Sequence, residues 1–383
     1  MRQTFFRMLA RLVRVFRPRR RESGGLRTVL VLQYQMPLGC CVHGTPLFAA
    51  MGETSPPPTV IVATRGTGQA TLAHDPHVAA LIETADPMLS LRSMWSVSRA
   101  IRAEIRRLEV QPDRVMQDAS NRRGRFALLA LMLGLAPTCG FGDVPELYDV
   151  PIAYDPERSL IDNNLRLAAE AGGLPEHLEP AVYFTRNECE RVRSLLAEVN
   201  PDSRPVTAFV VQGSGGQRTA WHEERFAEVI RYVEALGHGV IFLGTAAEAA
   251  EIERTRHAAG GRGQSLAGRT SVAELAALLC LCDLLITVDT GTMHVGRASG
   301  VPMVVLGPSW QRPLEWLPLG IPQARVLRGG DRDDVPPGYR LDEIQVEDVL
   351  AAARELLEIY PATNDAREAR TAARLSSIRE TQR

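Results

Sequence analysis

The sequence predicts an α/β protein built from two similar doubly wound halves. Short apolar segments bounded by turn-forming residues alternate with segments of helical periodicity, first before residue 180 and again after residue 205. Strands that alternate with helices form parallel sheets, because a helical crossover connects each strand to the next. With 383 residues, of which 45% are hydrophobic and 23% are charged, the chain is long enough for two globular domains.

Three segments of the first half are typical of buried strands, because each is a short apolar run bounded by turn-forming residues. They cover residues 28–33, 59–63 and 113–117. A loop rich in glycine and proline and a helix from Thr45 follow the first segment, and a helical stretch over 123–133 follows the third. We therefore predict a Rossmann-like domain over residues 26–180.

The same alternation repeats in the second half. The predicted strands cover residues 207–211, 239–243, 284–288 and 303–306, and the predicted helices cover residues 186–199, 223–236, 246–257 and 271–281. We therefore predict a second Rossmann-like domain over residues 181–345. A helix to Leu357 and a charged tail complete the chain over residues 346–383, and the polarity of the tail predicts a solvated appendage.

The composition excludes several classes of protein. A formal net charge of −1 gives no basic excess to neutralise phosphates, so we expect no nucleic-acid partner. The six cysteines form no CxxC pair and no histidine cluster has zinc spacing, so no metal site is expected. This cysteine usage, and the lack of an apolar run of the roughly 18 residues that a transmembrane helix needs, favour a cytoplasmic protein. All 44 basic residues are arginine, so any site that requires a cation must use arginine.

The first 25 residues differ from the rest of the chain. Residues 1–21 contain eight arginines and no acid, while Phe5, Leu9, Leu12 and Phe16 recur at helical spacing. A basic amphipathic helix of this kind can lie on an anionic membrane surface, and we expect peripheral membrane contact there. A helix docked on the body of the protein, a disordered arm and an organellar transit peptide remain open alternatives.

The most informative stretch is DTGTMH at residues 289–294, where an apolar segment ends in small polar residues that begin a helix. At such a turn, the free backbone N–H groups and the positive end of the helix form a site for anions such as phosphate. Gly291 allows close approach of the backbone, and Thr290 and Thr292 add hydroxyl groups. His294 lies about one turn into the helix and is expected to point towards the same place.

Two further polar turns are expected at the same edge of the sheet, because parallel strands end together. One follows the first predicted strand of the second half and contains Ser214 and Arg218; the other follows the next strand and contains Glu248. Glycine-rich backbone and a guanidinium group suit the phosphates of a nucleotide diphosphate, and a carboxylate suits its ribose hydroxyls. The alternative is that Asp289 only caps the helix and His294 only packs inside the protein.

At these residues the chain resembles family 9 of the glycosyltransferases, typified by the ADP-heptose:lipopolysaccharide heptosyltransferases. The resemblance is carried by DTGTMH, by the following VGRASGVPMVVLGPS, by LAGRTSVAELAALLCLCDLLITV from residue 266 and by WHEERFAEVI from Trp221. It covers residues 206–320 well. Over residues 27–141 it is weaker and rests on VLVLQYQMPLGCCVHGTPLFAA and VMQDASNRRGRFALLALMLG.

This resemblance implies the GT-B fold, in which two Rossmann-like domains face each other across a cleft. The acceptor lies mainly on the first domain and the nucleotide-sugar donor mainly on the second. The implied reaction is an inverting transfer without a metal ion, from a nucleotide-diphosphate donor to a bacterial envelope glycan or lipid. In the family's best-known members the donor is ADP-linked and the sugar is a heptose.

The resemblance also implies which residues hold the donor. In the implied site the ribose is held by Glu248, and the diphosphate and sugar are surrounded by Asp289, Thr290, Gly291 and His294. Dipoles and arginine would then stabilise the leaving diphosphate in place of Mg²⁺. Thr219 stands where the family often has a lysine, so the neighbouring Arg218 is expected to contact phosphate.

One departure from the family's pattern concerns the catalytic base. In its first loop the family usually has Gly-Asp followed three residues later by His, whereas here Gly39 is followed by Cys40 and then by His43. A thiol with a pKa of about 8.5 is mostly protonated at neutral pH, whereas an imidazole with a pKa near 6.5 can accept a proton. His43 is therefore the candidate base beside Cys40, with packing against the cleft floor as its alternative.

The same substitution keeps other functions open. A non-catalytic relative that binds a nucleotide sugar or a glycan would tolerate Cys40 in place of the family's aspartate. A sugar-nucleotide epimerase of the same fold is a third and less favoured alternative.

Overall fold

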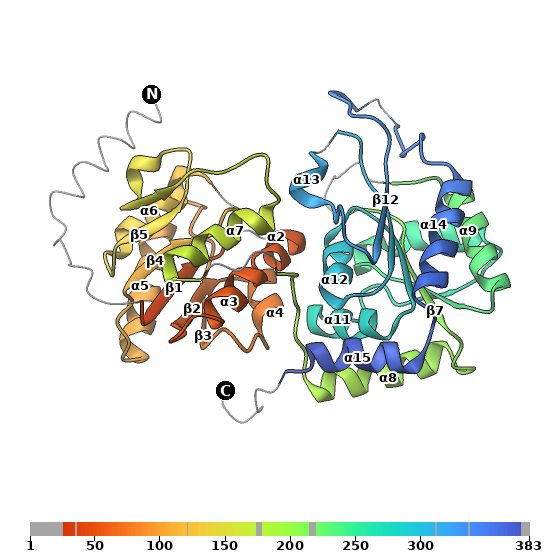
Figure 1. Cartoon of the computed structure of the whole chain (residues 1–383), viewed down its shortest axis with the longest axis horizontal. Helices are drawn as coiled ribbons and strands as arrows, with labels where there is room; N and C mark the ends of the chain where they lie inside the picture. Colours follow the sequence, from red (N-terminus) through yellow and green to blue (C-terminus); the bar gives the residue numbers. More distant parts are fainter. Residues whose placement is uncertain are drawn as a thin grey trace. The chain divides into compact units, whose positions relative to one another are not determined.

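The computed structural model describes residues 26–34, 37–120, 122–173, 178–213, 220–310, 312–335 and 338–376. The chain divides between Pro180 and Ala181 into two units, each built on its own sheet (Figure 1). The predicted basic segment 1–25 lies outside the described residues. None of the helices that the structure describes has both the length and the apolar character needed to cross a membrane.

The first unit is built on a six-stranded parallel sheet. Its strands are β1 (Thr28–Leu32), β2 (Thr59–Thr64), β3 (Ala80–Glu83), β4 (Arg114–Gln117), β5 (Thr138–Phe141) and β6 (Val150–Ile152). They lie in the order β3-β2-β1-β4-β5-β6, and every neighbouring pair is parallel. The predictions of β1, β2 and β4, and of a doubly wound first half, are confirmed. The short strands β3, β5 and β6 were not expected from the sequence.

Helices cover both faces of this sheet. They are α2 (Leu38–His43), α3 (Thr45–Gly52), α4 (Thr67–Leu72), α5 (Leu91–Arg107), α6 (Gly124–Leu133) and α7 (Leu160–Ala168), with single 3₁₀ turns at Pro145–Leu147 and Ala169–Ala171. Helices α5 and α6 share one core with Leu30 and Leu32 of β1, to which α5 contributes Met94, Val97 and Ile101. Strand side chains alternate between the two faces of a sheet, so Val29 and Val31 of β1 point to the opposite face. Both sets are fully buried, as in a sheet covered on both sides.

The second unit repeats this architecture. Its strands are β7 (Val206–Val210), β8 (Gly239–Phe242), β9 (Gln264–Ser265), β10 (Leu284–Val288), β11 (Met303–Leu306) and β12 (Ala324–Leu327), in the order β12-β11-β10-β7-β8-β9. Its helices are α8 (Arg186–Val199), α9 (Glu223–Ala235), α10 (Ala249–Ala258), α11 (Val272–Leu281), α12 (Gly291–Ser299), α13 (Pro313–Trp316), α14 (Val346–Ile359) and α15 (Asn364–Arg374), with a 3₁₀ turn at Ala246–Glu248. The predicted strands and helices of this half are confirmed to within a few residues.

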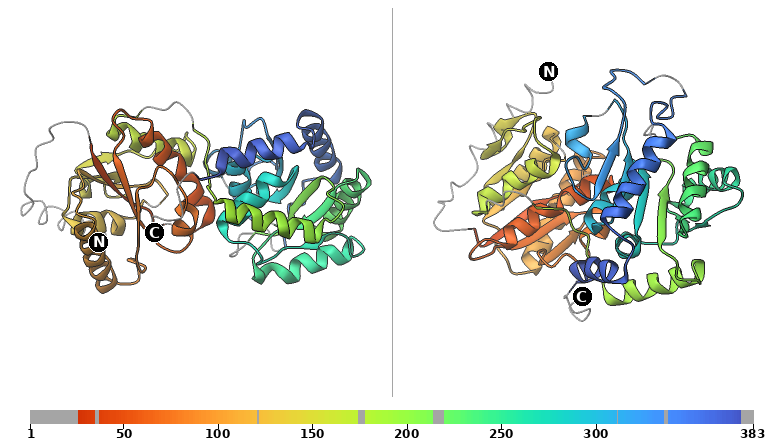
Figure 2. Two further views of the ribbon diagram at one scale, coloured as in Figure 1. Left: turned by 90° about the horizontal axis from the view of Figure 1, so that it is seen from below. Right: turned by 45° about the vertical axis from the view of Figure 1, so that its right-hand side comes forward.

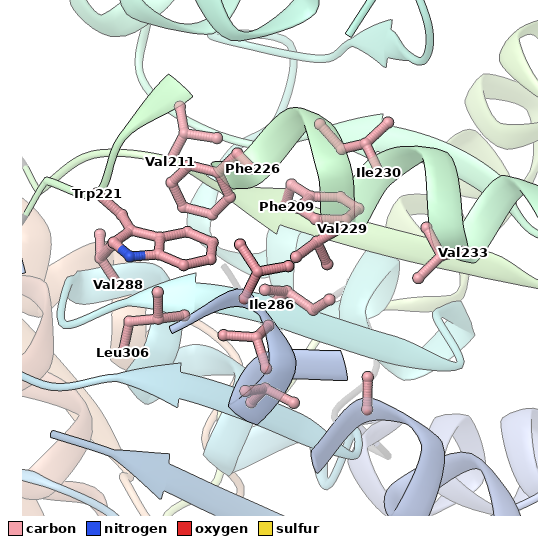
Figure 3. Packing of buried hydrophobic residues seen from close by; sticks show 14 of the residues in the cluster. Phe209, Val211, Trp221, Phe226, Val229, Ile230, Val233, Ile286, Val288 and Leu306 are labelled. Atoms are coloured by element: carbon pink, nitrogen blue, oxygen red, sulfur yellow. The ribbon is translucent and has the colours of Figure 1, made fainter. Parts of the chain in front are cut away.

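One large core fixes the second sheet beneath α9 and α14. Phe209 of β7 packs against Phe226 of α9, with ring centroids 6.4 Å apart, and Phe226 in turn meets Trp221 edge-on at 5.0 Å (Figure 3). The Trp221 indole N–H donates to the backbone carbonyl of Ile344 at 3.1 Å, so the polar end of this fully buried ring is satisfied. Ile286, Val288 and Leu306 complete the strand side of this core (Figure 3).

Both sheets reverse their strand order at one point. In the first sheet this happens between β1 and β4, and in the second between β7 and β10. Loops that leave the carboxyl ends of such a pair turn to opposite faces, which opens a crevice where ligands of doubly wound proteins bind. The four loops that follow β1, β4, β7 and β10 are therefore the places where a functional site is expected.

The C-terminal tail is not the solvated appendage that its polarity predicted. Helix α15 lies beside α8 and packs on α11 (Figures 1 and 2). Arg367 forms two hydrogen bonds to the buried carboxylate of Asp283, at 2.9 and 2.7 Å. Arg370 donates to the carbonyls of Cys280 and Cys282, and Arg374 to that of Ala298. Polar side chains dock this helix, so a search for apolar periodicity could not detect it.

We predict that Arg367→Ala destabilises the protein by about 3 kcal/mol, because it leaves the buried Asp283 carboxylate without its cation. Arg193→Ala is the matched control: it removes an exposed ion pair to Glu368 on the same helix and should cost less than about 1 kcal/mol. Urea unfolding followed by circular dichroism measures both. Equal losses for the two variants would contradict a docking role for Arg367.

Candidate functional site

The start of α12 is held in place by the buried strand before it. All five residues of β10 are buried, and the chain passes through Asp289 and Thr290 into α12, which begins at Gly291. Thr290 is the residue before the helix and has extended backbone angles, and its side chain makes no capping hydrogen bond. Thr290, and not Asp289, therefore occupies the position directly before the helix. The first N–H groups of a helix have no partner within it, and those of α12 lie at the carboxyl edge of the sheet, where ligands bind.

Asp289 and His294 are brought together at this helix start, as the sequence predicted. His294 Nε2 lies 3.8 Å from Asp289 Oδ1, and the two residues are only 5% and 3% exposed. Trp316 of α13 meets the imidazole ring edge-on, with centroids 6.4 Å apart. The buried Arg297 follows on the same helix. An acid, an imidazole and an aromatic ring thus surround the amino end of α12.

Burial shifts the pKa values of both titratable groups towards their neutral forms. The pKa of Asp289 is raised to about 6 by loss of solvation. The pKa of His294 is lowered to about 3, first by loss of solvation and then by the positive charge of Arg297. At neutral pH, His294 is therefore an uncharged imidazole beside a carboxylate that has lost most of its hydration. Such a pair gains stability from any ligand that supplies hydrogen-bond donors or positive charge.

Thr290 adds a polar group to the same place. Its Oγ1 is buried and has no hydrogen-bond partner among the residues that the structure describes. Gly291 and Thr292, which follow it, are only half-buried and therefore reachable by solvent. A buried hydroxyl at the amino end of a helix, next to reachable backbone N–H groups, suits an anion that accepts several hydrogen bonds.

The loops after β7 and β8 open at the same edge, because both strands run parallel to β10 in one sheet. An antiparallel bridge between Gln212 and Ala220 closes the loop after β7 at its base. The predicted Ser214 and Arg218 lie in that loop, outside the described residues. Glu248, after β8, accepts hydrogen bonds from the N–H and the hydroxyl of Thr245, at 2.6 and 3.0 Å. Its carboxylate therefore already has a local role as part of a capping box.

In the first unit, the residues predicted for catalysis lie on α2. Cys40 is 4% exposed and His43, the last residue of that helix, is fully buried. The backbone carbonyl of His43 accepts a hydrogen bond of 3.1 Å from Asn164 Nδ2. The Oδ1 atom of the same asparagine accepts from the backbone N–H of Ala119 at 2.7 Å. Asn164 therefore ties the end of α2 to the loop after β4.

This tie places α2 next to a carboxylate that the sequence did not single out. Asp118 directly follows β4 and is 1% exposed, and its Oδ1 accepts a 2.7 Å hydrogen bond from Ser120. Burial raises its pKa to about 6, while hydrogen bonding from Ser120 opposes the rise. The register pairs Leu32 with Gln117, so Gln33 and Asp118 each directly follow one of two neighbouring strands. Asp118 could have been found from the sequence, because an acid directly after a predicted central strand is expected at the edge where ligands bind.

Two glycines allow this polar cluster to pack closely. A Cβ atom at Gly44 would come within 2.2 Å of Gln33 Nε2, and one at Gly68 within 2.1 Å of Thr64 Oγ1. Neither position tolerates a side chain without displacing a buried polar group. The geometry at the carboxyl ends of β1, β2 and β4 is thus built around polar side chains.

Among the described residues, no three His, Cys, Asp or Glu side chains lie close enough together to hold a metal ion. All six cysteines are buried thiols.

Residues 116–325, more than half of the chain, match the family described as "Glycosyltransferase family 9 (heptosyltransferase)". The chain belongs to this family. The resemblance noted in the sequence is therefore confirmed at the level of the family. The matched range includes Asp118 in the first unit and the whole Asp289–His294 segment in the second.

Individual relatives are more distant. Lipooligosaccharide heptosyltransferase 2 of Haemophilus influenzae is 28% identical over 138 residues, which cover 34% of this chain and 38% of that protein. The match to this relative thus spans less than half of its length.

Solved structures match over more of the chain. A family 9 glycosyltransferase of Veillonella parvula superposes with a TM-score of 0.74 at 20% identity, covering 87% of this chain and 97% of the other. The E. coli ADP-heptose LPS heptosyltransferase II superposes with a TM-score of 0.71 at 20% identity, covering 87% and 99%. These matches confirm the predicted fold class, GT-B with two Rossmann-like doubly wound domains.

The electrostatics of the Asp289 and His294 pair predict that Asp289→Asn stabilises the unliganded protein above pH 6. The folded-state pKa of about 6 exceeds the usual 3.8, so the folded state binds the proton more tightly and loses stability as the pH rises between these values. At pH 7.5 the amide should therefore add up to about 3 kcal/mol to the free energy of unfolding, and the gain should vanish towards pH 4.

Urea unfolding of both proteins across this pH range measures the effect. Asp342→Asn is the matched control with the opposite sign, because His222 lowers the pKa of the exposed Asp342 carboxylate through a hydrogen bond. A gain for Asp289→Asn that does not depend on pH would contradict the burial of a charge.

Proposed function

We propose that this protein is an inverting glycosyltransferase that moves a sugar from a nucleotide-diphosphate donor to an envelope glycan or lipid of a bacterium, without a metal ion. Membership of family 9 supports the type of reaction. The observation that carries the proposal is the buried Asp289 and His294 pair at the amino end of α12, beside the buried hydroxyl of Thr290. An ADP-linked heptose is the donor to test first, because the structurally similar E. coli enzyme is an ADP-heptose heptosyltransferase.

In this proposal the second unit binds the donor. The diphosphate accepts hydrogen bonds from the N–H groups of Gly291 and Thr292 and from the hydroxyl groups of Thr290 and Thr292. Arg218 adds a positive charge to the phosphates and Ser214 adds a hydroxyl group, both from the loop after β7. Glu248 binds the ribose hydroxyls through its carboxylate while it still caps its own turn. Neutral His294 donates a hydrogen bond from one ring nitrogen to the sugar or diphosphate.

The transfer takes place in one step. The acceptor hydroxyl oxygen forms a bond to the anomeric carbon while the bond from that carbon to the diphosphate oxygen breaks. The acceptor proton passes to a base on the protein, and the nucleoside diphosphate leaves with the bonding electron pair. Backbone dipoles and Arg218 stabilise the charge that develops on the leaving group, so the step requires no metal ion.

The base is proposed to come from the cluster at the end of β1 and β4. His43 is the imidazole at the family's histidine position, and Cys40 occupies the position of the family's aspartate. Asp118 offers a buried carboxylate, with a pKa of about 6, that can accept a hydrogen bond from the acceptor. We propose His43 as the base and Asp118 as the neighbouring acid that orients the acceptor.

A second candidate function is non-catalytic binding of a nucleotide sugar or glycan. The observation that favours it is the buried thiol of Cys40 in place of a carboxylate. Under this alternative the donor site persists and turnover is absent.

The proposal also includes a place in the cell. Six buried thiols support a reducing compartment, and we propose that the protein works in the cytoplasm at the inner face of the membrane. Residues 1–21, with eight arginines and no acid, supply a basic segment for peripheral contact.

We predict that ADP binds to the wild-type protein and that Asp289→Ala and His294→Ala each weaken this binding at least about ten-fold. The loss should arise because His294→Ala removes a hydrogen-bond donor from the donor site, and because Asp289→Ala removes the carboxylate, 3.8 Å from His294 Nε2, that orients the imidazole. Isothermal titration calorimetry in the presence of EDTA measures it and tests independence from metal ions. His77→Ala is the matched control, since His77 forms a 3.0 Å pair with Asp75 in the first unit. No binding to the wild type would overturn the proposed donor site.

We predict that His43→Ala lowers kcat by about 100-fold and leaves ADP affinity unchanged, because it removes the base without touching the donor site. Turnover of ADP-heptose with a lipopolysaccharide acceptor, measured through the release of ADP, gives kcat. Asp118→Asn is run in parallel and should raise the KM for the acceptor more than it lowers kcat.

Cys40→Asp decides between the two candidate functions. If the wild type binds ADP but shows no turnover, and Cys40→Asp turns over, the non-catalytic alternative is correct.

A further inference from the structure

Large apolar side chains are exposed on the first turns of α5 and just before it. Leu89, Leu91 and Trp95 are 77%, 67% and 54% exposed. Seven large hydrophobic side chains of the described residues are exposed in this way, and three of the seven lie within this short stretch. Scattered exposed apolar residues are ordinary, whereas a local group of them indicates a surface that meets another apolar phase.

The exposure is not a sign that α5 lacks a core. The inner face of the helix, with Met94, Val97, Ile101 and Ile105, is fully buried in the core that it shares with α6 and the sheet. The outer residues Leu91 and Trp95 are one helical turn apart and therefore lie on one stripe. Helix α5 thus presents apolar side chains on two sides, and only one side is covered by the protein.

The apolar stripe is bordered by arginines. Arg92 and Arg99 are exposed on the same helix, and the Arg99 guanidinium lies over the Trp95 ring, 4.7 Å from its centroid. Arg125, at the start of α6, is also exposed and donates to the carbonyl of Met88 at 3.1 Å, next to Leu89. These guanidinium groups are therefore held at the border of the apolar stripe.

The stretch before and within the first turns of α5 contains no acidic residue to oppose this charge. From residue 87 to residue 103 the chain contains three arginines and no Asp or Glu. The acid just before this stretch, Asp86, pairs with Arg65 at 3.1 Å. The surface therefore carries a net positive charge around an apolar centre.

The topology places this surface at the carboxyl edge of the first sheet. The residues from Thr84 to Ser90 leave the carboxyl end of β3 and lead into α5, so Leu89 and Leu91 lie at that edge. The loop with Asp118 leaves the carboxyl end of β4 at the same edge, and Arg125 follows it. The apolar stripe and the polar cluster of the first unit are therefore on one side of one sheet.

We propose that Leu89, Leu91, Trp95 and the surrounding arginines form a surface that docks on an anionic lipid bilayer. Leucine and tryptophan side chains partition into the boundary between headgroups and acyl chains, and guanidinium groups bind the phosphates of anionic headgroups. An acidic partner protein would satisfy the arginines but would not require three protruding apolar side chains. The use of this surface to present a lipid acceptor rests on the proposed function; the contact with lipid does not.

This surface is distinct from the basic segment at the amino terminus, and tryptophan fluorescence separates the two. Residues 1–21 contain no tryptophan, whereas the proposed surface contains Trp95. Of the other three tryptophans, Trp221 is buried in the second unit and Trp310 and Trp316 are half-buried there. If lipid quenches tryptophan emission in the wild type but not in a variant without Trp95, the quenching therefore reports on α5.

The first experiment uses the full chain and vesicles of phosphatidylcholine with about 30% phosphatidylglycerol, with bromine on the acyl chains of the phosphatidylcholine. We expect the vesicles to quench part of the tryptophan emission of the wild type, and we expect Trp95→Phe to abolish that quenching while it retains vesicle binding. The quenching should persist when residues 1–21 are deleted. Quenching that survives in Trp95→Phe, or that is lost on deletion of residues 1–21, would overturn the proposal.

The second experiment measures sedimentation with the same vesicles. The triple variant Leu89→Ser, Leu91→Ser, Trp95→Ser should bind at least about ten-fold more weakly than the wild type. The matched control is Leu236→Ser with Ile359→Ser, which removes two apolar side chains of similar exposure, 49% and 51%, from the second unit. Equal binding of the triple variant and the control would overturn the proposal, as would undiminished binding to vesicles without phosphatidylglycerol.

Neither experiment contains a donor or an acceptor. Vesicle binding through Trp95 without sugar transfer would contradict only the proposed function, and transfer to a soluble acceptor without quenching would contradict only the lipid surface.

Discussion

The parallel pairing of β10 with β7 is the constraint on which the donor side of this protein depends. The register sets Thr287 beside Val210, so both strands end at one edge and their loops leave on opposite sides of the sheet. This arrangement carries Asp289, His294 and the amino end of α12 to one point. The first sheet has the same arrangement at β1 and β4, and the loops after these strands bring Cys40, His43 and Asp118 to one edge. One topological rule, used twice, therefore produces both polar clusters.

Each cluster contains a carboxylate held in surroundings that disfavour its charge. Asp289 and Asp118 come from different units, and burial raises the pKa of each to about 6. A fold selected only for stability would replace such groups with amides or apolar side chains. Their presence at the ends of central strands indicates that binding and chemistry, and not the packing of the core, determine which residues stand there.

Much of the second unit could be predicted from the sequence because its strands are continuous apolar runs and its helices carry strong capping residues. The Asp289–His294 segment follows such a strand directly, so its place at the edge of the sheet was evident from its spacing. Strands β3, β5 and β6 were not predicted because they are only three or four residues long. In addition, Gly140 interrupts the apolar pattern of β5 and Pro151 that of β6.

Helix α5 was not predicted, although its buried residues Met94, Val97, Ile101 and Ile105 recur at helical spacing and were a usable signal. The sequence shows an acid at position 118 directly after a predicted strand. Its burial, and the link through Asn164 to the end of α2, could not be predicted because they depend on contacts between residues far apart in the chain. The charged residues of α15 predicted a solvent-exposed tail. An analysis of periodicity detects buried apolar side chains, but it does not detect hydrogen bonds from arginine to carbonyl groups.

Helix α15 also has a consequence for any experiment that modifies the carboxyl terminus. Arg374 donates to the carbonyl of Ala298, in the last turn of α12, and thereby braces the far end of the helix whose first turn faces the proposed ligand. The strand-like pairing of Leu375 with Phe184 continues this brace by two residues. A purification tag or fusion partner should therefore be joined beyond Ser376. A junction placed earlier would remove the contacts that hold the carboxyl end of α12.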